Sequence, residues 1–280
     1  MTKGRIFDIQ RGSLVDGDGV RTAVFFKGCS LRCKWCHNPE GISRDTQLLV
    51  YSDRCRSCGI CKSVCPSPSD CILCGKCADY CPNGARELCG REYTEKELFS
   101  IIEKDRGLYN STGGGVTFSG GECMLQIDFL EKMLTLCNEN SINTAVDTAG
   151  NVPLEHFLKI APLVNTFLYD VKCASEDLHI EGTGVSNKQI LSNLRSLSDN
   201  GARIYIRIPI IVGFNDTLSE QNKIKELLKG INCEKIELLP YHEMGVRKCV
   251  AAGVREYSFS SPDKEKMKEL NLLYKEIIKK

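Results

Sequence analysis

Residues 25–38 read FFKGCSLRCKWCHN, and this stretch decides the fold and the chemistry. It begins as an apolar strand and runs into three cysteines, Cys29, Cys33 and Cys36, with the spacing Cys-x3-Cys-x2-Cys. Three thiolates can hold three irons of a cubane iron–sulfur cluster and leave the fourth iron without a protein ligand. A catalytic metal needs such an open position, whereas structural metal sites are closed. The stretch therefore predicts a catalytic cluster directly after the first strand.

The composition is that of an ordinary globular protein. Of the 280 residues, 42% are apolar and 26% are charged, which excludes a disordered or collagen-like chain. A net charge of +1 gives no reason to expect a nucleic acid or a membrane surface as partner. The first residues lack the apolar centre of a signal peptide, and no apolar run of about 18 residues occurs. We therefore expect a cytoplasmic protein, a monomer with reduced thiols and no nucleic-acid or membrane partner.

Cysteine is the unusual residue, because the chain has 17. In a reducing compartment such cysteines are better interpreted as metal ligands than as disulfides. Eight of them form two runs of four, each with the spacing Cys-x2-Cys-x2-Cys-x3-Cys-Pro. This is the bacterial ferredoxin pattern. The fourth cysteine of each run ligates the other cluster. One cluster is therefore expected on Cys55, Cys58, Cys61 and Cys81, and a second on Cys65, Cys71, Cys74 and Cys77.

Two other interpretations of this cysteine-dense segment stay open. Cys-x2-Cys pairs also bind structural zinc. Alternatively, two iron–sulfur clusters could hold the segment folded without carrying electrons, since the segment has too few apolar residues for a core of its own.

The segment divides the chain into three parts. Residues 1–48 begin the main domain, residues 49–90 are the insert, and residues 91–280 complete the main domain. Six strands, separated mostly by helices, predict a parallel sheet of an α/β fold, arranged as an open, incomplete barrel. The predicted strands are Val20–Lys27, Val116–Ser119, Thr144–Thr148, Thr166–Lys172, Ile204–Ile211 and Lys235–Leu239. The predicted helices are Leu125–Asn138, Leu154–Ile160, Lys188–Ser198, Ser219–Leu228 and Asp263–Lys279.

Further motifs accompany the cysteines: DGDGVRT at 16–22, CHNPE at 36–40, GGVTFSGGE at 114–122, DVK at 170–172, RIP at 207–209 and LPYH at 239–242. With them the chain resembles, over nearly its whole length, the activating enzymes of glycyl radical enzymes, in the radical S-adenosylmethionine superfamily. Trp35, before the third cysteine, fits the same pattern. The resemblance implies a partial (β/α)6 radical-SAM barrel with an inserted 2x[4Fe-4S] ferredoxin-like domain.

The resemblance also implies the reaction and the cofactors. Three [4Fe-4S] clusters are expected, one ligated by S-adenosylmethionine and two auxiliary. Reductive cleavage of S-adenosylmethionine would give methionine and a 5'-deoxyadenosyl radical, which abstracts a hydrogen atom from one glycine of a partner glycyl radical enzyme. A flavodoxin or ferredoxin would supply the electron. The sequence does not say which glycyl radical enzyme is the partner.

The site residues follow from the same resemblance. A possible monovalent cation is placed at Asp147 and Asp170, because two facing carboxylates at strand ends need a cation unless one protonates. Catalytic roles are expected for Lys172, His242 and Asp16. Residues expected to bind the cofactor are Trp35, Cys36, His37, Gly120, Gly121, Glu122, Asp147, Asp170, Val171, Lys172, Arg207 and His242.

Several of these residues have a simpler interpretation. The glycines could form an ordinary turn, the aspartates could be surface residues, Arg207 could form a structural ion pair, and His242 could be structural. Two positions depart from the family, which usually has proline where this chain has Asp18 and Cys123. We expect Cys123 to be a small buried filler.

Two different functions are the alternatives. One is a radical enzyme acting on a small molecule or a peptide, although its auxiliary clusters would usually lie after the barrel. The other is a non-catalytic iron–sulfur electron carrier, which leaves the three-cysteine motif unexplained.

Overall fold

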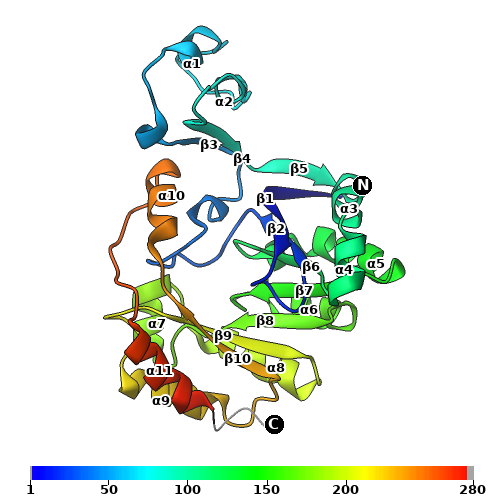
Figure 1. The fold of residues 1–280 in the computed structure, drawn as a ribbon. Coiled ribbons are helices and arrows are strands. Elements are labelled where there is room, and N and C mark those ends of the chain that lie inside the picture. The colour runs from blue at the N-terminus through cyan, green and yellow to red at the C-terminus, as the bar shows by residue number, and fades with distance from the viewer. Residues whose placement is uncertain (1, 276–280) are drawn as a thin grey trace.

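A computed structural model describes residues 2–275. Its main feature is an eight-stranded sheet in the order β10-β9-β8-β7-β6-β2-β1-β5, of which the first six strands are parallel (Figure 1). The six predicted strands are confirmed, in nearly the predicted positions. They are β2 (Arg21–Phe26), β6 (Gly115–Gly120), β7 (Asn143–Thr148), β8 (Thr166–Asp170), β9 (Ile204–Ile210) and β10 (Lys235–Pro240).

Two antiparallel strands extend the sheet beyond β2 and were not predicted. β1 (Lys3–Ser13) pairs with β2, and β5 (Arg91–Thr94) pairs with β1. Within β1 only Gly4 and Ile6 are buried. The strand therefore lacks the apolar alternation that would have revealed it in the sequence.

Helices pack against the parallel strands and enclose the main core. The core combines strand residues such as Phe118, Val146 and Ile206 with helix residues such as Met133 and Leu194. The helices of the main domain are α3 (Glu95–Glu103), α4 (Arg106–Thr112), α5 (Ile127–Glu139), α6 (Leu154–Ile160), α7 (Glu176–Thr183), α8 (Lys188–Asp199), α9 (Leu218–Leu228), α10 (Val246–Ala251) and α11 (Lys264–Tyr274).

The predicted helices are confirmed with small shifts. The segment before α5 starts as a 3-10 turn, η3 (Cys123–Gln126). Side chains cap three helices: Thr94 forms a capping box with Glu97 at α3, Thr217 caps α9, and Asp263 caps α11. Residues 276–279 of the predicted last helix lie outside the described residues. Among residues 2–275, no helix has the length and apolar character needed to cross a membrane.

The cysteine-dense segment projects from one end of the molecule (Figure 1). It is closed at its base by an antiparallel pair, β3 (Gln47–Val50) and β4 (Arg86–Cys89). Between them lie two four-residue helices, α1 (Ile60–Ser63) and α2 (Lys76–Asp79), each preceded by a glycine with positive φ. The small apolar cluster at the base includes Ala251 of α10, so the segment shares its core with the main domain.

Candidate active site

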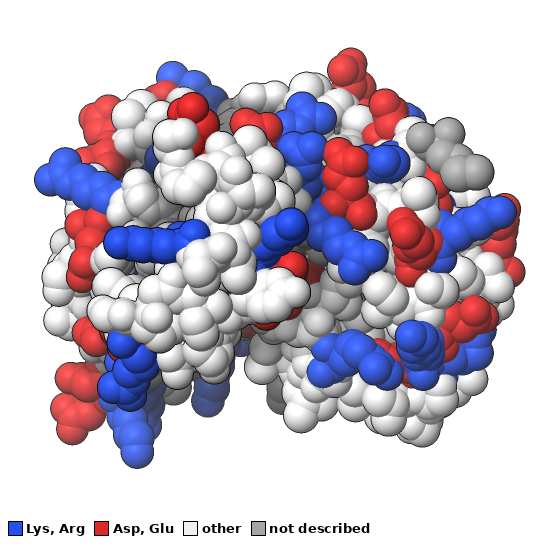
Figure 2. Space-filling view, turned by 90° about the horizontal axis from the view of Figure 1, so that it is seen from above, with Lys and Arg blue, Asp and Glu red and all other residues white. Residues whose placement is uncertain are grey.

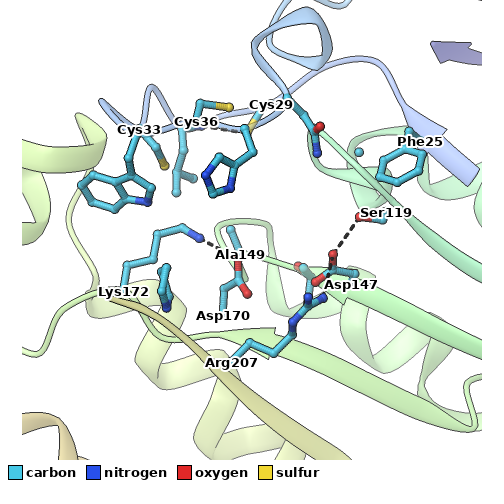
Figure 3. Close-up of a pocket in the computed structure, with 18 of the residues that line it drawn as sticks. Phe25, Cys29, Cys33, Cys36, Ser119, Asp147, Ala149, Asp170, Lys172 and Arg207 are labelled. Carbon is cyan, nitrogen blue, oxygen red and sulfur yellow. Dashed lines mark hydrogen bonds and ion pairs between the residues drawn. The ribbon is translucent and has the colours of Figure 1, made fainter. Parts of the chain in front are cut away.

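A cavity of about 250 Å³ lies where the parallel strands end, under the three-cysteine loop (Figure 3). Cys29, Cys33 and Cys36 lie along one side of it, and polar side chains from the ends of β7 and β8 and from β9 lie along the other. The carboxyl ends of parallel strands are where ligand sites of α/β folds occur. The structure thus brings the three cysteines and the predicted strand-end residues Asp147, Asp170 and Lys172 to one place.

Backbone hydrogen bonds fix the cysteine loop. The amides of Arg32 and Lys34 donate to the carbonyls of Thr183 and Gly182 at the end of α7, at 2.8 and 2.9 Å. On the other side, Gly28 N donates to Gly41 O at 2.7 Å. The loop is therefore held from both sides, independently of any ligand.

The three thiols suit a metal cluster. Burial raises the pKa of Cys29 to about 12 and also raises the pKa of Cys33 and Cys36. Each thiol would hold its proton here unless a metal took its place, because the thiolate is the metal ligand. Their position on one cavity wall fits a cluster held from one side, with the opposite side facing the polar residues.

Trp35 packs against the cavity wall. Its ring centroid lies 4.6 Å from that of Phe214 and 6.3 Å from that of Phe259. Gly182 leaves space for it, because a Cβ there would lie 2.7 Å from Trp35 Cζ3. Trp35 therefore anchors the loop between the second and third cysteines.

Two ion pairs provide the charges of the cavity. Lys172 Nζ donates to Asp170 Oδ2 at 2.6 Å, and Arg207 Nη1 lies 3.4 Å from Asp147 Oδ2. Burial raises the pKa of Asp147 to about 6, although Arg207 opposes that shift. Each carboxylate has a cationic partner, so charge balance alone does not require a monovalent metal ion here.

Arg207 also has an unused donor. Its Nε is buried and, among the described residues, has no hydrogen-bond partner. A buried donor of this kind calls for an acceptor. An anionic or polar ligand in the cavity would supply one.

The Gly120–Gly121 turn brings backbone close to the cavity. Gly120 has a φ of 112°, and a Cβ there would lie 2.2 Å from Phe26 N. Both glycines line the cavity. Only glycine permits this conformation and this close approach.

Three of the predicted cofactor-binding residues do not line the cavity. Glu122 is fully buried behind it, where its carboxylate accepts from Thr148 Oγ1 at 2.9 Å and Ala149 N at 3.1 Å. Val171 belongs to the main core. His242 lies outside, stacked on His37 with ring centroids 4.0 Å apart. Glu122 and His242 therefore support residues of the wall: Glu122 holds Thr148 and Ala149, and His242 holds His37.

Asp16 lines the cavity from the loop between β1 and β2. Its carboxylate accepts from Ser13 Oγ at 2.5 Å, and its carbonyl accepts from Thr117 Oγ1 at 2.7 Å. Asp18, in the same loop, accepts from Tyr205 at 2.5 Å and Arg203 at 3.1 Å. The aspartate that replaces the usual proline thus ties this loop to β9.

Other residues of the wall were not predicted. Ser119 Oγ donates to Asp147 Oδ2 at 2.7 Å, and Thr148 and Ala149 follow Asp147 at the end of β7. Their position at the ends of predicted strands could have indicated that they line the cavity. Cys123, by contrast, is completely buried in the main core and has no place in the cavity wall.

The insert cysteines gather in two sets. Cys55, Cys58, Cys61 and Cys81 line one cavity, and Cys65, Cys71, Cys74 and Cys77 line another. Each set joins three cysteines of one run to the fourth cysteine of the other.

Comparisons with known proteins place this geometry in a family. The Radical SAM superfamily matches residues 74–224. The chain is 42% identical to the trans-4-hydroxy-L-proline dehydratase activating enzyme of Clostridioides difficile, over 96% of this chain and 95% of that protein. It is 44% identical to the choline trimethylamine-lyase activating enzyme of Oleidesulfovibrio alaskensis, over 88% and 86%. The chain belongs to the glycyl radical enzyme activating family of the radical S-adenosylmethionine superfamily.

Another member of the family and two solved structures are also similar to this chain. The (2S)-3-sulfopropanediol dehydratase activating enzyme of Klebsiella oxytoca is 34% identical over 90% of this chain and 86% of that protein. A domain of a pyruvate-formate lyase-activating enzyme from Bacteroides vulgatus aligns with a TM-score of 0.51 and 29% identity, covering 59% of this chain and 95% of that domain. A radical SAM methyltransferase from Sphaerobacter thermophilus shares the fold alone, with a TM-score of 0.58 and 15% identity over 98% of this chain and 72% of that one. Membership in the activating family is the reason to set aside the peptide-modifying and electron-carrier alternatives.

Proposed function

We propose that this activating enzyme installs a radical on one glycine of a partner glycyl radical enzyme, using a [4Fe-4S] cluster held by Cys29, Cys33 and Cys36. When bound, the reduced cluster would supply one electron that cleaves S-adenosylmethionine to methionine and a 5'-deoxyadenosyl radical, and this radical would take a hydrogen atom from the glycine α carbon to give 5'-deoxyadenosine and the glycyl radical. The main support is one observation: the three cysteines share a cavity with the paired charges of β7–β9. The fold that positions them is proposed to be the partial (β/α)6 barrel.

The chain's own residues bind and orient the S-adenosylmethionine. Lys172, held by Asp170, places a positive charge near the position for the methionine carboxylate. Arg207 offers its free Nε to a carboxylate or ribose oxygen. The Gly120–Gly121 backbone is close enough to contact the amino group. Binding in this way excludes water from the reacting bond and fixes its orientation.

The partner's glycine loop is proposed to enter beside Asp16. The neighbouring Leu14 and Val15 are 73% and 74% exposed. Met244, two residues after His242, is also 76% exposed. Exposed apolar side chains of this kind suit contact with a polypeptide loop, and glycine suits abstraction because no side chain blocks its α carbon.

Residues 49–90 are proposed to be a ferredoxin-like domain with two auxiliary [4Fe-4S] clusters on the two cysteine sets. Four thiols around each cavity support this arrangement. Exposed apolar side chains, among them Ile72 and Tyr80, lie beside the cysteines. Figure 2, viewed from above Figure 1, shows a broad uncharged surface among scattered basic and acidic residues. Such a surface suits docking of a small electron carrier, a flavodoxin or ferredoxin.

The test is activation of a partner. The anaerobically reconstituted enzyme would be incubated with reductant, S-adenosylmethionine and candidate glycyl radical enzymes of the hydroxyproline dehydratase and choline lyase types. We expect a glycyl radical doublet by electron paramagnetic resonance with the cognate partner and none when its radical glycine is alanine. A full set of clusters without a doublet on any glycyl radical enzyme would contradict the proposal.

A further inference from the structure

Asn215 is a fully buried asparagine in the turn that follows β9. Its side-chain Nδ2 donates to Lys172 O at 2.8 Å and to Pro209 O at 2.6 Å. Its Oδ1 accepts from Ile211 N at 2.9 Å. Both amide hydrogens and the amide oxygen are therefore bonded, and these bonds fix the orientation of the side chain.

The two carbonyls that Asn215 joins lie at the ends of neighbouring strands. β8 and β9 are parallel, and after the last paired residues Val171 N still donates to Arg207 O at 2.9 Å. The backbone pairing cannot continue in the same way, because Pro209 has no N–H to donate. Asn215 donates to a carbonyl of each chain at this point. It therefore joins the two strand ends where their backbone pairing stops.

The joined strand ends carry the two cations of the cavity. Lys172 and Arg207 lie opposite the cysteines (Figure 3). Asn215 bonds to the backbone of Lys172 itself and to Pro209, two residues after Arg207. Asn215 does not line the cavity. Any effect that it has on a ligand must therefore act through the positions of these two cations.

Two helices hold Asn215 from behind. Gln221 of α9 donates through its Nε2 to Asn215 O at 2.7 Å, and Tyr274 of α11 donates to Gln221 Oε1 at 2.8 Å. Both side chains are buried, and a fully bonded polar network in a core makes its surroundings rigid. Stability alone does not require that this network end at the two strand ends that carry the cations.

We propose that Asn215 is a positioning residue for S-adenosylmethionine: by joining Lys172 to Pro209, it sets the separation of Lys172 and Arg207 so that both reach one ligand. The inference rests on the proposed function, in which these two cations bind the cofactor. A site whose groups are already in place binds more tightly, because less has to be ordered on binding. Loss of Asn215 should therefore weaken binding of S-adenosylmethionine. It should not prevent cluster assembly, because separate backbone bonds hold the cysteine loop.

Equilibrium dialysis with radiolabelled S-adenosylmethionine tests this inference. The reconstituted enzyme is kept anaerobic and without reductant, so that the ligand is bound but not cleaved. Asn215→Ala removes both donors, and Gln221→Met removes only the bond that holds Asn215 from behind. Tyr109→Phe is the control: it removes a buried hydroxyl that donates to Ile102 O at 2.9 Å and does not line the cavity. Iron content and thermal unfolding are measured for every variant.

We expect the dissociation constant for S-adenosylmethionine to rise at least about tenfold in Asn215→Ala and about threefold in Gln221→Met, with wild-type iron content. Tyr109→Phe should lose stability and keep wild-type affinity. Unchanged affinity in Asn215→Ala would overturn the inference, as would unchanged affinity in Gln221→Met if Asn215→Ala does not fold. Equal weakening in Tyr109→Phe would also overturn it, because the cause would then be lost stability. A wild type that carries all three clusters and binds no S-adenosylmethionine would instead contradict the proposed function.

Discussion

At the scale of single residues, buried charge is what distinguishes this site. Asp147 and Asp170 each lie against one cation, and Glu122 is buried behind them without one within 4.0 Å among the described residues. Burial raises the pKa of Glu122 to about 7, although hydrogen bonds from Thr148 and the backbone oppose the shift. A carboxyl that titrates near neutrality makes the stability of the fold depend on pH.

Replacing Glu122 by glutamine should remove that dependence. The folded pKa lies above its ordinary value of 4.5, so the stability from this group is complete below pH 4.5 and is lost as pH rises through 7. The loss reaches about 3 kcal/mol. Denaturant unfolding of wild type and Glu122→Gln at pH 5 and pH 8 would measure it. Relative to the wild type, the free energy of unfolding of the variant should be higher at pH 8 than at pH 5. An equal difference in unfolding free energy at both pH values would contradict the prediction.

Asp18 gives a second prediction at this scale. Asp18→Ala removes its contacts with Arg203 and Tyr205. Because the aspartate is partly exposed, the loss of stability should stay below about 1 kcal/mol. Amide hydrogen exchange at residues 14–20 should nevertheless become faster. Asp45→Ala, which removes an exposed ion pair with Arg5, is the control; equal exchange at 14–20 in both variants would refute a role for Asp18 in holding the loop.

At the scale of elements, the end of α7 supports the cysteine loop. Its carbonyls accept from Arg32 and Lys34, and Gly182 leaves room for Trp35. The glycine is therefore needed for its size, since a Cβ would also lie 2.3 Å from Phe214 Cζ.

Gly182→Ala should displace Trp35 and the loop. We expect a loss of about 1–3 kcal/mol, as for overpacked cores, together with weaker binding of the loop cluster. Gly107→Ala in α4 is the matched control, because a Cβ there meets nothing within 4 Å, and it should stabilise by about 0.5–1 kcal/mol. Thermal unfolding and iron content of both variants would show the contrast. A Gly182→Ala protein with normal iron and stability would exclude the supporting role.

At the scale of the whole molecule, the sequence predicted those features that depend on local spacing. The six parallel strands and the cysteine motifs could be predicted because each depends on residues that are close together in the sequence. The pairing of Asp147 with Arg207 is not, because these residues come from β7 and β9, with β8 between them in the sheet. Glu122 could not be placed either, since its carboxylate is bonded to Thr148 and Ala149, which lie at the end of a different strand, β7. The sequence of β1 has too little apolar alternation to predict a strand.

The crossed arrangement of the insert predicts which cysteines act together. Cys55→Ser and Cys81→Ser should each remove the same auxiliary cluster, because both cysteines line one cavity. Cys65→Ser and Cys71→Ser should each remove the other. Iron content and electron paramagnetic resonance of the reduced proteins would compare the pairs. Loss of one signal in Cys55→Ser and of a different one in Cys81→Ser would mean that each run forms its own cluster.

The central claim concerns the cavity under Cys29, Cys33 and Cys36. The most direct measurement is of 5'-deoxyadenosine, formed anaerobically from S-adenosylmethionine and dithionite by the reconstituted wild type and by Cys33→Ala. We predict the product from the wild type and none from the variant, whose insert clusters remain intact. A wild type with all three clusters that forms no 5'-deoxyadenosine, or a variant that forms as much, would contradict the claim.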